Sequence, residues 1–288
     1  MLKLCMAIII DGNKIAQDIR NEVRQGVHEL KEQKGIVPGL AVVLVGDDHA
    51  SKIYVGKKEQ DCAEVGFLSR AYKLPADTSE EKLLKIIHEL NNDKLIHGIL
   101  VQLPLPKHIN QDKIIEAIDP RKDVDGFHPY NIGRLVAGNP GHLSCTPYGI
   151  LELLDRCCID PSGKEAVVVG RSNIVGKPMA LMLLARNATV TVCHTRTRDL
   201  KAMTSRADIL IAAAGRAQMI KGDMVKEGVV VIDVGTNRLD TGKLVGDVAF
   251  AEVAPKASYI TTVPGGVGPM TRAMLMKNTL NAASKIIS

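Results

Sequence analysis

The 288-residue sequence contains few aromatic residues and no tryptophan: Phe, Trp and Tyr together make up 3%. Because nucleic-acid-binding platforms stack bases on exposed aromatic side chains, this composition argues against a nucleic-acid partner. The six cysteines form no C-x-x-C pair, and the eight histidines show no H-E-x-x-H spacing. We therefore expect reduced thiols, no disulfide framework and no bound metal.

The sequence also lacks a hydrophobic run long enough to cross a membrane. The apolar stretch at residues 4–10 is too short for this and is ended by Asp11. It has no small-residue cleavage site, so it does not resemble a signal peptide. We therefore predict no membrane association and a cytoplasmic location, and Met6 is an alternative start to Met1.

The rest of the composition is that of an ordinary globular protein, with 45% hydrophobic and 24% charged residues. The net charge of +5 is modest and spread along the chain. It favours solubility and, as a second interpretation, attraction for small molecules that carry phosphate or carboxylate groups. The length predicts about two domains.

The spacing of apolar residues predicts alternating helices and strands. Helices are expected over 13–34, 50–65, 110–118 and 269–287, with another after the capping box at residues 78–81. Strands are expected at 40–45, 67–74, 96–101, 166–169, 189–193, 208–213, 229–234 and 259–262. This alternation favours an α/β fold with parallel sheets.

Residues 119–144 are rich in Gly, Pro and Asn and show little periodicity, so we expect a long loop. After it, Thr146 is the predicted N-cap of a helix, with Pro147 at its first position. We therefore predict two α/β domains with an interdomain cleft. The first covers residues 1–145 and 270–288, and the second is a Rossmann-like dinucleotide-binding domain at 146–269.

The segment from Val167 to Gly176 gives the strongest indication of function. A run of valines leads into Gly170-Arg171-Ser172 and then a helix, which is the strand, turn and helix order of a dinucleotide fold. Ser172 replaces the middle glycine of G-x-G-x-x-G. The backbone N–H groups of such a turn suit a pyrophosphate. A plain βα turn without a ligand is the alternative.

The end of the next strand indicates which dinucleotide is bound. NAD enzymes normally place an acidic residue there to bond the ribose 2′-hydroxyl, whereas residues 194–198 read His-Thr-Arg-Thr-Arg. Thr195, together with Arg171 in the preceding turn, suits a 2′-phosphate and favours NADP. A solvated basic loop is the alternative, and the nearby Asp199 weakens the preference.

Tyr54 and Lys58 lie four residues apart on a predicted helix, so both side chains project from one face. A lysine can act as a base only if its pKa falls toward neutrality. Gln102 ends a predicted strand, where α/β folds place their ligands, and could bond Lys58. Without further context, an exposed surface pair is the simpler interpretation of Tyr54 and Lys58.

Several motifs together resemble one known family. They are Tyr54-x-x-x-Lys58, Val-Gln-Leu-Pro-Leu-Pro at 101–106, Asp-Val-Asp-Gly-Phe at 123–127, Gly-Arg-Ser-x-x-Val-Gly-x-Pro at 170–178, and Pro-Gly-Gly-Val-Gly-Pro-Met-Thr at 264–271. Over nearly its whole length the chain resembles the bifunctional methylenetetrahydrofolate dehydrogenase/methenyltetrahydrofolate cyclohydrolase family of the bacterial FolD type. The resemblance implies oxidation of methylenetetrahydrofolate by NADP, hydrolysis of the methenyl product to 10-formyltetrahydrofolate, and a homodimer.

The resemblance also implies roles for individual residues. Lys58 becomes the acid–base group of the hydrolysis, Tyr54 shapes the folate-binding face, and Gln102 fixes the position of Lys58. Asp125 binds the pterin through a two-pronged hydrogen bond, although an ordinary turn aspartate before Gly126 is the alternative. The further implied folate-binding residues are Ser51, Pro264, Gly265 and Gly266, and the implied cofactor-binding residues are Gly170, Arg171, Ser172, Gly176, Thr195 and Thr236.

Four residues depart from the usual pattern of this family, and none removes a catalytic group. They are His49, Ser144, Thr236 and Ala249. Two other functions stay open at this point. One is a two-domain NAD(P) dehydrogenase of another small substrate, such as an amino acid or a shikimate-type compound. The other is a nucleotide-sensing module without catalysis.

Overall fold

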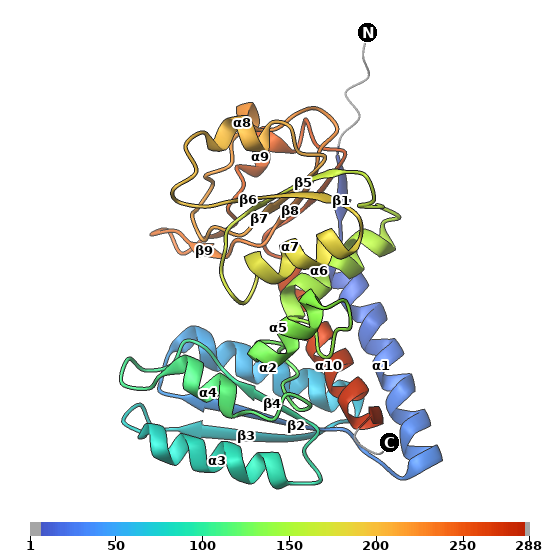
Figure 1. Cartoon of the computed structure of the whole chain (residues 1–288), viewed down its shortest axis with the longest axis vertical. Coiled ribbons are helices and arrows are strands. Elements are labelled where there is room, and N and C mark those ends of the chain that lie inside the picture. Colours follow the sequence, from blue (N-terminus) through green and yellow to red (C-terminus); the bar gives the residue numbers. More distant parts are fainter. Residues whose placement is uncertain (1–6, 286–288) are drawn as a thin grey trace. The chain divides into compact units, whose positions relative to one another are not determined.

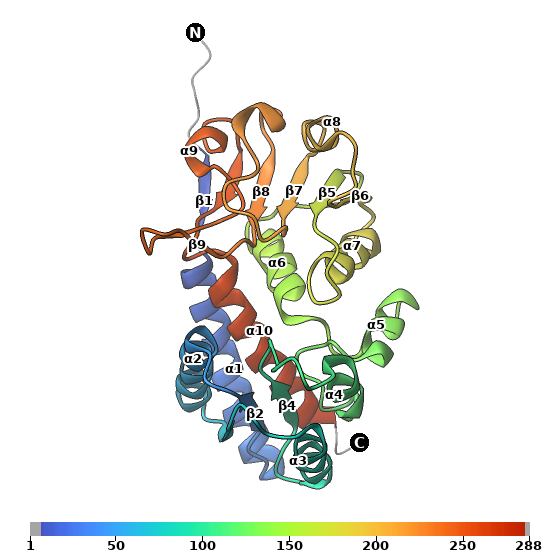
Figure 2. The same cartoon turned by 90° about the vertical axis from the view of Figure 1, so that its left-hand side faces the viewer.

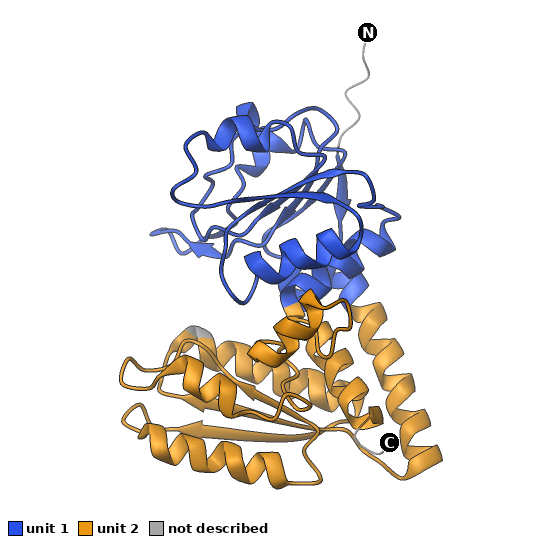
Figure 3. Ribbon diagram, viewed as in Figure 1, with its two compact units in different colours: residues 1–16, 146–271 blue, residues 17–145, 272–288 orange. Residues whose placement is uncertain are grey.

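The computed structural model describes residues 7–285, so the two candidate start positions, Met1 and Met6, lie outside the described residues, as does Cys5. The chain divides into two compact units (Figure 3). Unit 1 comprises the described residues up to Ala16 and the segment Thr146–Thr271; unit 2 comprises Gln17–Cys145 and the described residues from Arg272 onward. Within residues 7–285, no helix is long and apolar enough to cross a membrane.

Unit 1 contains a six-stranded parallel sheet with the strand order β1-β11-β8-β7-β5-β6. Its strands are β1 (Ile8–Ile10), β5 (Glu165–Val169), β6 (Thr189–Cys193), β7 (Ile209–Ala212), β8 (Val230–Asp233) and β11 (Tyr259–Thr261). Figure 2 shows β8, β7, β5 and β6 following one another across this sheet. The central strands are runs of valine and isoleucine that are buried almost throughout, as expected where both faces of a sheet are covered.

Helices cover both faces of the unit 1 sheet, with α6 and α7 on one side and α8 and α9 on the other (Figure 1). The remaining elements of the unit are α6 (Cys145–Arg156), α7 (Gly176–Ala185), α8 (Leu200–Thr204), the 3-10 turn η1 (Gly222–Met224), α9 (Phe250–Val253) and the short hairpin of β9 (Asn237–Arg238) and β10 (Leu244–Val245). A parallel sheet between two helical layers is the doubly wound arrangement, which confirms the predicted Rossmann-like fold.

The amino-terminal strand β1 belongs to this same sheet. Ile8, Ile9 and Ile10 pair in parallel with Tyr259, Ile260 and Thr261 of β11. The division predicted from the sequence placed residues 1–145 together in the other domain. The difference arises because a three-residue strand at the edge of a sheet has no periodicity that distinguishes it from the start of a helical domain.

Unit 2 contains a three-stranded parallel sheet with the order β3-β2-β4. Its elements are α1 (Gly12–Lys34, which begins in unit 1), β2 (Gly39–Val45), α2 (His49–Val65), β3 (Leu68–Leu74), α3 (Glu80–Asn92), β4 (Gly98–Val101), α4 (Gln111–Ala117), α5 (Pro129–Val136) and α10 (Val267–Lys285, which also begins in unit 1). Every residue of the central strand β2 is buried. The apolar face of α3, with Leu83 and Ile87, packs with Val43 and Ile99 in one hydrophobic cluster.

Helix ends follow the polar residues that flank them. Asn110 accepts hydrogen bonds from the N–H groups of Asp112 and Lys113 and caps α4, as predicted. The predicted capping box at residues 78–81 is wrong, because Ser79 rather than Thr78 is the N-cap of α3 and accepts from the N–H of Lys82 at 3.2 Å, which puts a lysine at the N3 position. The hydroxyl of Thr78 is buried and has no hydrogen-bond partner among the described residues.

The long loop predicted at residues 119–144 is partly wrong, because it contains the helix α5. His128 caps this helix by accepting a hydrogen bond from the N–H of Tyr130 at 3.0 Å, and Pro129 occupies its first position. Only two of its eight residues, Asn131 and Leu135, are buried. Two buried positions are too few to produce a periodic signal, so the sequence pattern missed this helix.

The next helix, α6, also begins differently from the prediction. It starts at Cys145, two residues before the predicted first position at Pro147, so Thr146 lies inside its first turn and is not the N-cap. The Thr146 hydroxyl instead forms a hydrogen bond with the hydroxyl of Thr271 at 2.9 Å. Ser144, one of the departures from the family pattern, donates through its hydroxyl to the carbonyl of Gly126 at 2.8 Å.

Candidate active site and cofactor pocket

Helix α2 places Lys58 in the interior of unit 2, where the residue is 9% exposed. Its Nζ donates a hydrogen bond to Oε1 of Gln102 at 2.9 Å. Gln102 directly follows β4, and its own Nε2 donates to the carbonyl of Leu103 at 2.8 Å, which fixes the orientation of the amide. The sequence prediction that Gln102 bonds Lys58 is therefore confirmed in the geometry, and Lys58 is not part of an exposed surface pair.

The charge state of Lys58 is shifted by its surroundings. Burial lowers the pKa of its amine, and the carboxylate of Asp125 and the thiols of Cys145 and Cys62 partly oppose this effect. Burial also raises the pKa of Asp125 to about 6, against the influence of the Lys58 charge. A base and an acid whose pKa values both move toward neutrality lie within electrostatic reach of each other, which is typical of a functional site.

The loop that carries Asp125 is held by a neighbouring carboxylate, Asp123, which is 1% exposed. Asp123 accepts hydrogen bonds from the N–H groups of Phe127 at 3.2 Å and His128 at 2.9 Å, and from Nδ2 of Asn131 at 2.8 Å. Sequence reasoning singled out only the second of these two aspartates. The signal that could have identified Asp123 is the spacing Asp-x-Asp before a glycine. In such a turn one carboxylate can bond the turn's own N–H groups while the other is available to a ligand.

The other predicted residues of α2 differ in exposure. Tyr54 is 41% exposed, one turn before Lys58. Ser51 is buried, and its N–H donates to Oδ2 of Asp48, the N-cap of the helix, at 2.8 Å. The helix thus presents an accessible aromatic ring and a buried amine one turn apart.

In unit 1, a pocket of about 350 Å³ opens where β5, β6 and β7 end. It is lined by Val169, Gly170, Arg171, Ser172, His194, Thr195, Thr197, Leu200, Ala213, Ala214, Arg216 and Met219. The carboxyl ends of parallel strands are where doubly wound folds bind their ligands. The structure therefore brings the predicted residues Gly170, Arg171, Ser172 and Thr195 to one cavity.

The turn at the start of this pocket requires its glycines. Gly170 has φ +135°, and a Cβ there would lie 2.1 Å from the carbonyl oxygen of Ala213. A Cβ at Gly176 would lie 2.3 Å from the carbonyl oxygen of Gly170. The backbone can therefore pass this closely only without side chains at both positions, as a pyrophosphate-binding turn needs.

Ser172, which replaces the middle glycine of the motif, satisfies the helix start itself. Its Oγ accepts hydrogen bonds from the N–H of Val175 at 3.1 Å and of Gly176 at 3.4 Å. Two amides at the beginning of α7 are therefore bonded within the protein. Fewer free N–H groups are left for a pyrophosphate than the motif alone predicted.

The loop after β6 is held in shape by its own polar groups. Oγ1 of Thr197 accepts from the N–H of His194 at 2.9 Å, and Nδ1 of His194 accepts from the N–H of Arg196 at 3.1 Å. Asp199 is the N-cap of α8 and accepts from the N–H of Ala202 at 2.9 Å. It is absent from the pocket lining, and none of the described residues that line this pocket is acidic. The lining thus has the cationic and hydroxyl groups that suit a phosphate.

Arg216 also lines this pocket, and sequence reasoning missed it. Its backbone N–H donates to Oδ1 of the buried Asp247 at 2.9 Å, and Oδ2 of the same carboxylate accepts from the N–H groups of Ala214 and Gly215. Asp247 thus fixes the loop after β7. Its position in the Gly-Asp-Val segment gave no indication of this role, because the two segments lie far apart in sequence.

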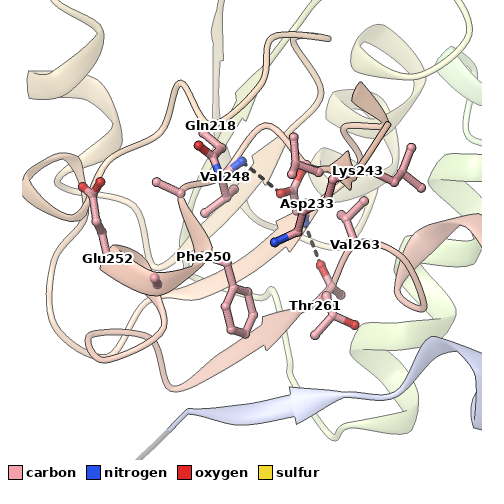
Figure 4. Close-up of a pocket in the computed structure, with 14 residues that line it drawn as sticks. Gln218, Asp233, Lys243, Val248, Phe250, Glu252, Thr261 and Val263 are labelled. Atoms are coloured by element: carbon pink, nitrogen blue, oxygen red, sulfur yellow. Dashed lines mark hydrogen bonds between the residues drawn. The ribbon is translucent and has the colours of Figure 1, made fainter. Parts of the chain in front are cut away.

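A second pocket of unit 1, of about 520 Å³, adjoins the ends of β8 and β11 (Figure 4). Asp233 accepts there from the N–H groups of Gly235, Asp247 and Val248, each at 2.9 Å, and burial raises its pKa to about 6. Ala249, another departure from the family pattern, is the N-cap of α9 and offers no side-chain cap. The loss of an aspartate there therefore affects a helix end.

The remaining predicted residues lie elsewhere in unit 1. Thr236 follows β8, is exposed, and is not among the residues that line the 350 Å³ pocket. Pro264 accepts a hydrogen bond through its carbonyl from the Thr262 hydroxyl at 2.9 Å. Gly265 has φ +103°, and a Cβ at Gly266 would lie 2.7 Å from the carbonyl of Thr262, so this segment is a tight turn that requires glycine.

Comparison with known proteins agrees with this geometry. Residues 10–125 match the family model described as tetrahydrofolate dehydrogenase/cyclohydrolase, catalytic domain. Residues 144–287 match the model described as tetrahydrofolate dehydrogenase/cyclohydrolase, NAD(P)-binding domain. The chain is 60% identical over 280 residues to the bifunctional protein FolD of Pelobacter propionicus, covering 97% of this chain and 99% of that protein. It is 61% identical over 279 residues to the FolD protein of Moorella thermoacetica, with the same coverage.

Solved structures give the same result. The FolD methylenetetrahydrofolate dehydrogenase/cyclohydrolase of Campylobacter jejuni is 52% identical with a TM-score of 0.96, covering 97% of this chain and 99% of that one. The FolD enzyme of Trypanosoma brucei, complexed with NADP cofactor and an inhibitor, is 38% identical with a TM-score of 0.94, covering 98% and 99%. Shikimate 5-dehydrogenase of Thermus thermophilus, at 15% identity, a TM-score of 0.54, and coverage of 85% and 99%, shares only the fold. The chain therefore belongs to the tetrahydrofolate dehydrogenase/cyclohydrolase family.

Proposed function

We propose that this protein oxidises 5,10-methylenetetrahydrofolate to 5,10-methenyltetrahydrofolate with NADP and then hydrolyses the product to 10-formyltetrahydrofolate. The observation that carries the proposal is the buried Lys58 amine, held by Gln102 and within electrostatic reach of Asp125, in a chain that belongs to this family. The relatives named as bifunctional FolD proteins support both activities. We assign the folate chemistry to unit 2 and NADP binding to unit 1, which correspond to the predicted domains of residues 1–145 with 270–288 and of residues 146–269, apart from β1 and the starts of α1 and α10.

Hydrolysis needs a group that takes a proton from the attacking water and a group that returns one to the departing nitrogen. Lys58 suits this role because burial lowers the pKa of its amine toward the neutral form. Gln102 accepts one N–H of the amine and so sets the direction of its remaining hydrogens and lone pair. A neutral amine can accept the proton from water and, once protonated, donate it to the leaving nitrogen.

Asp125 is the proposed anchor for the pterin ring, whose amino group and ring nitrogen match a carboxylate in two parallel hydrogen bonds. The exposed ring of Tyr54 and the hydroxyl of Ser51 belong to the same proposed folate-binding face. Pro264, Gly265 and Gly266 of unit 1 are further proposed folate-binding residues. Burial raises the pKa of Asp125 to about 6, so its carboxylate gains from a hydrogen-bonding partner.

Hydride transfer would require no protein acid or base, since NADP, when bound, would supply the hydride acceptor. The protein contributes by holding the cofactor. We propose that Gly170, Ser172 and Gly176 form the pyrophosphate turn, and that Arg171 and Thr195 bind the 2′-phosphate. Thr236 does not line the 350 Å³ pocket, and we propose that it contributes to the rim of the cofactor site beyond it. The NADP complex of the Trypanosoma brucei relative supports the choice of dinucleotide.

The resemblance to the FolD type also leads us to propose a homodimer in the cytoplasm. Sedimentation of the purified protein tests the dimer.

Mixing the protein with methylenetetrahydrofolate and NADP tests the function directly, because the absorbance band of NADPH should appear. Hydrolysis of added methenyltetrahydrofolate is followed separately by loss of its own absorbance. Lys58→Met should abolish hydrolysis while NADP binding persists. Lys57→Met, at the exposed neighbouring lysine, is the matched control and should retain both activities. A nucleotide-sensing module would bind NADP without either absorbance change, and retained hydrolysis in Lys58→Met would refute the role of that amine.

A further inference from the structure

Unit 2 contains a buried ion pair that the proposed function does not use. Arg272 on α10 donates through Nη1 to both carboxylate oxygens of Asp61 on α2, at 2.9 and 2.8 Å. The side chains are 20% and 5% exposed, respectively. Because removing two charges from water costs free energy, a buried ion pair is a weak device for stability alone. The pair therefore calls for an explanation in terms of what lies beside it.

Asp61 lies three residues after Lys58 on the same helix, so the two side chains share one face. A lysine and an aspartate at this spacing are close enough to pair with each other. Here each has a different partner: Lys58 donates to Gln102 at 2.9 Å, and Asp61 accepts from Arg272. The Arg272 guanidinium thus pairs with the Asp61 carboxylate, which would otherwise be available to the Lys58 amine.

We propose that the Asp61–Arg272 pair is a positioning device for the hydrolysis step, in which Arg272 holds the Asp61 carboxylate away from Lys58 and leaves the amine to Gln102. The inference rests on the proposed function, because it requires Lys58 to be the acid–base group. Asp61 and Arg272 need not touch the substrate; they act through the environment of Lys58.

The charges around the amine agree with this arrangement. Burial lowers the pKa of Lys58, the Arg272 guanidinium lowers it further, and Asp125, Cys145 and Cys62 oppose them. Asp125 is the carboxylate among these leading contributions, and Asp61 is not one of them.

Asp61 has its own set of neighbours. Burial raises the pKa of Asp61, whereas Arg272 and Arg20 lower it and Glu64 raises it. Arg20 is already engaged with Glu64 at 3.1 Å. Without Arg272, Asp61 would lose its direct partner, and Lys58 would lose a neighbouring cation. Both changes favour the protonated form of the Lys58 amine.

The test is the pH profile of methenyltetrahydrofolate hydrolysis in the full-length protein. Arg272→Gln should move the acidic limb of the profile by about one pH unit toward higher pH, so that activity on that limb falls about tenfold and recovers in alkaline buffer. Asp61→Asn leaves the guanidinium unpaired beside Lys58 and should move the limb toward lower pH. The acidic limb of the double variant Asp61→Asn/Arg272→Gln should lie near that of the wild type. Arg272→Lys keeps a cation at this position, so its limb should also stay close to the wild-type pH.

The matched control is Lys73→Gln, which breaks the exposed pair of Lys73 with Glu59, the residue after Lys58, and should leave the limb in place. A loss by the same factor at every pH in Arg272→Gln would assign the pair a structural role only and overturn the proposal. If that variant does not fold, an unmoved limb in Asp61→Asn overturns it equally. A wild type without hydrolysis would refute the proposed function and this inference with it, whereas an active wild type with unmoved variants refutes this inference alone.

Discussion

The cofactor pocket of unit 1 and the Lys58 site of unit 2 are built in opposite ways. The pocket depends on the path of the backbone: two glycines without space for a Cβ, a serine that bonds helix amides, and loops whose main-chain N–H groups donate to side chains. The Lys58 site depends on side chains: a buried amine, an amide that holds it and a nearby carboxylate, and burial shifts the pKa values of the amine and the carboxylate. Binding a large dinucleotide requires a pocket of complementary shape, whereas moving a proton requires a titratable group whose pKa lies near neutral pH.

The comparison predicts different sensitivities to mutation. A pocket shaped by backbone should fail when a side chain is added, and a site made of buried ionisable groups should respond to pH and to changes of charge. Each of the following variants tests one side of this contrast, beginning with the largest expected effect.

Gly170→Ala should weaken NADP binding by more than about 100-fold, because displacing a binding loop by about an ångström has effects of this size. The new Cβ would lie 2.1 Å from the carbonyl oxygen of Ala213, so the turn must move. Fluorescence titration with NADPH measures the loss. Hydrolysis of added methenyltetrahydrofolate should continue. Gly163→Ala is the control, since Gly163 also has a positive φ, of +72°, but has open space around it; unchanged binding in Gly170→Ala would contradict a backbone-shaped pocket.

Arg171→Ala tests whether side chains add specificity to this backbone frame. Hydrogen bonds to charged groups contribute about 1.5–3 kcal/mol, so NADP affinity should fall about 10- to 100-fold while NAD affinity stays the same. Titration with both dinucleotides gives the ratio. Arg186→Ala removes an exposed arginine that pairs with Asp155 and serves as the control for lost charge. Equal losses for NADP and NAD would remove Arg171 from the 2′-phosphate site.

Asp125→Asn should raise the melting temperature of the protein at pH 7.5 by a few degrees. The pKa of Asp125 is raised to about 6 by burial, so the folded state binds its proton more tightly than the unfolded state. The wild type and Asp125→Asn should therefore be equally stable near pH 4. The wild type should become less stable than the variant as the pH rises toward 6, and this difference should persist above pH 6. Melting curves across this range measure the effect, and folate oxidation should be lost because the carboxylate is missing.

Asp119→Asn, in the same unit, should change the melting temperature in the opposite direction. The side chain and backbone N–H of Arg121 hold the pKa of Asp119 below its usual value. Its carboxylate therefore stabilises the fold above the usual aspartate pKa, and the asparagine variant should melt lower at pH 7.5 but not in strong acid. Matching pH dependences in the two variants would show that Asp125 is not a buried charge maintained for function.

The same contrast explains how far the sequence could be interpreted. Continuous valine and isoleucine runs, glycine turns and caps identified the strands around Gly170 and the helix that carries Lys58, because these signals are local. The pairing of Lys58 with Gln102 could be expected because a family motif contains each residue.

Interactions between distant segments left no such signal. Asp247 and the loop of Arg216 are 31 residues apart in sequence, and Asp61 and Arg272 are 211 apart; each pair is defined only by the folded chain. The helix α5 was missed for a different reason, since its buried face is too short to show a period. The start of α3 was misplaced by one residue because Thr78 and Ser79 are both good cap residues.

The two neighbouring hydroxyls of Thr78 and Ser79 at the start of α3 should contribute differently to stability. Ser79→Ala removes a hydroxyl that satisfies a backbone N–H, at Lys82, and should cost about 1 kcal/mol of unfolding free energy. Thr78→Val removes a buried hydroxyl that has no partner among the described residues, so its loss should be neutral or stabilising. Urea unfolding of the two variants measures the difference, and both should keep full activity. A larger loss in Thr78→Val than in Ser79→Ala would place the cap at Thr78, where the sequence pattern put it.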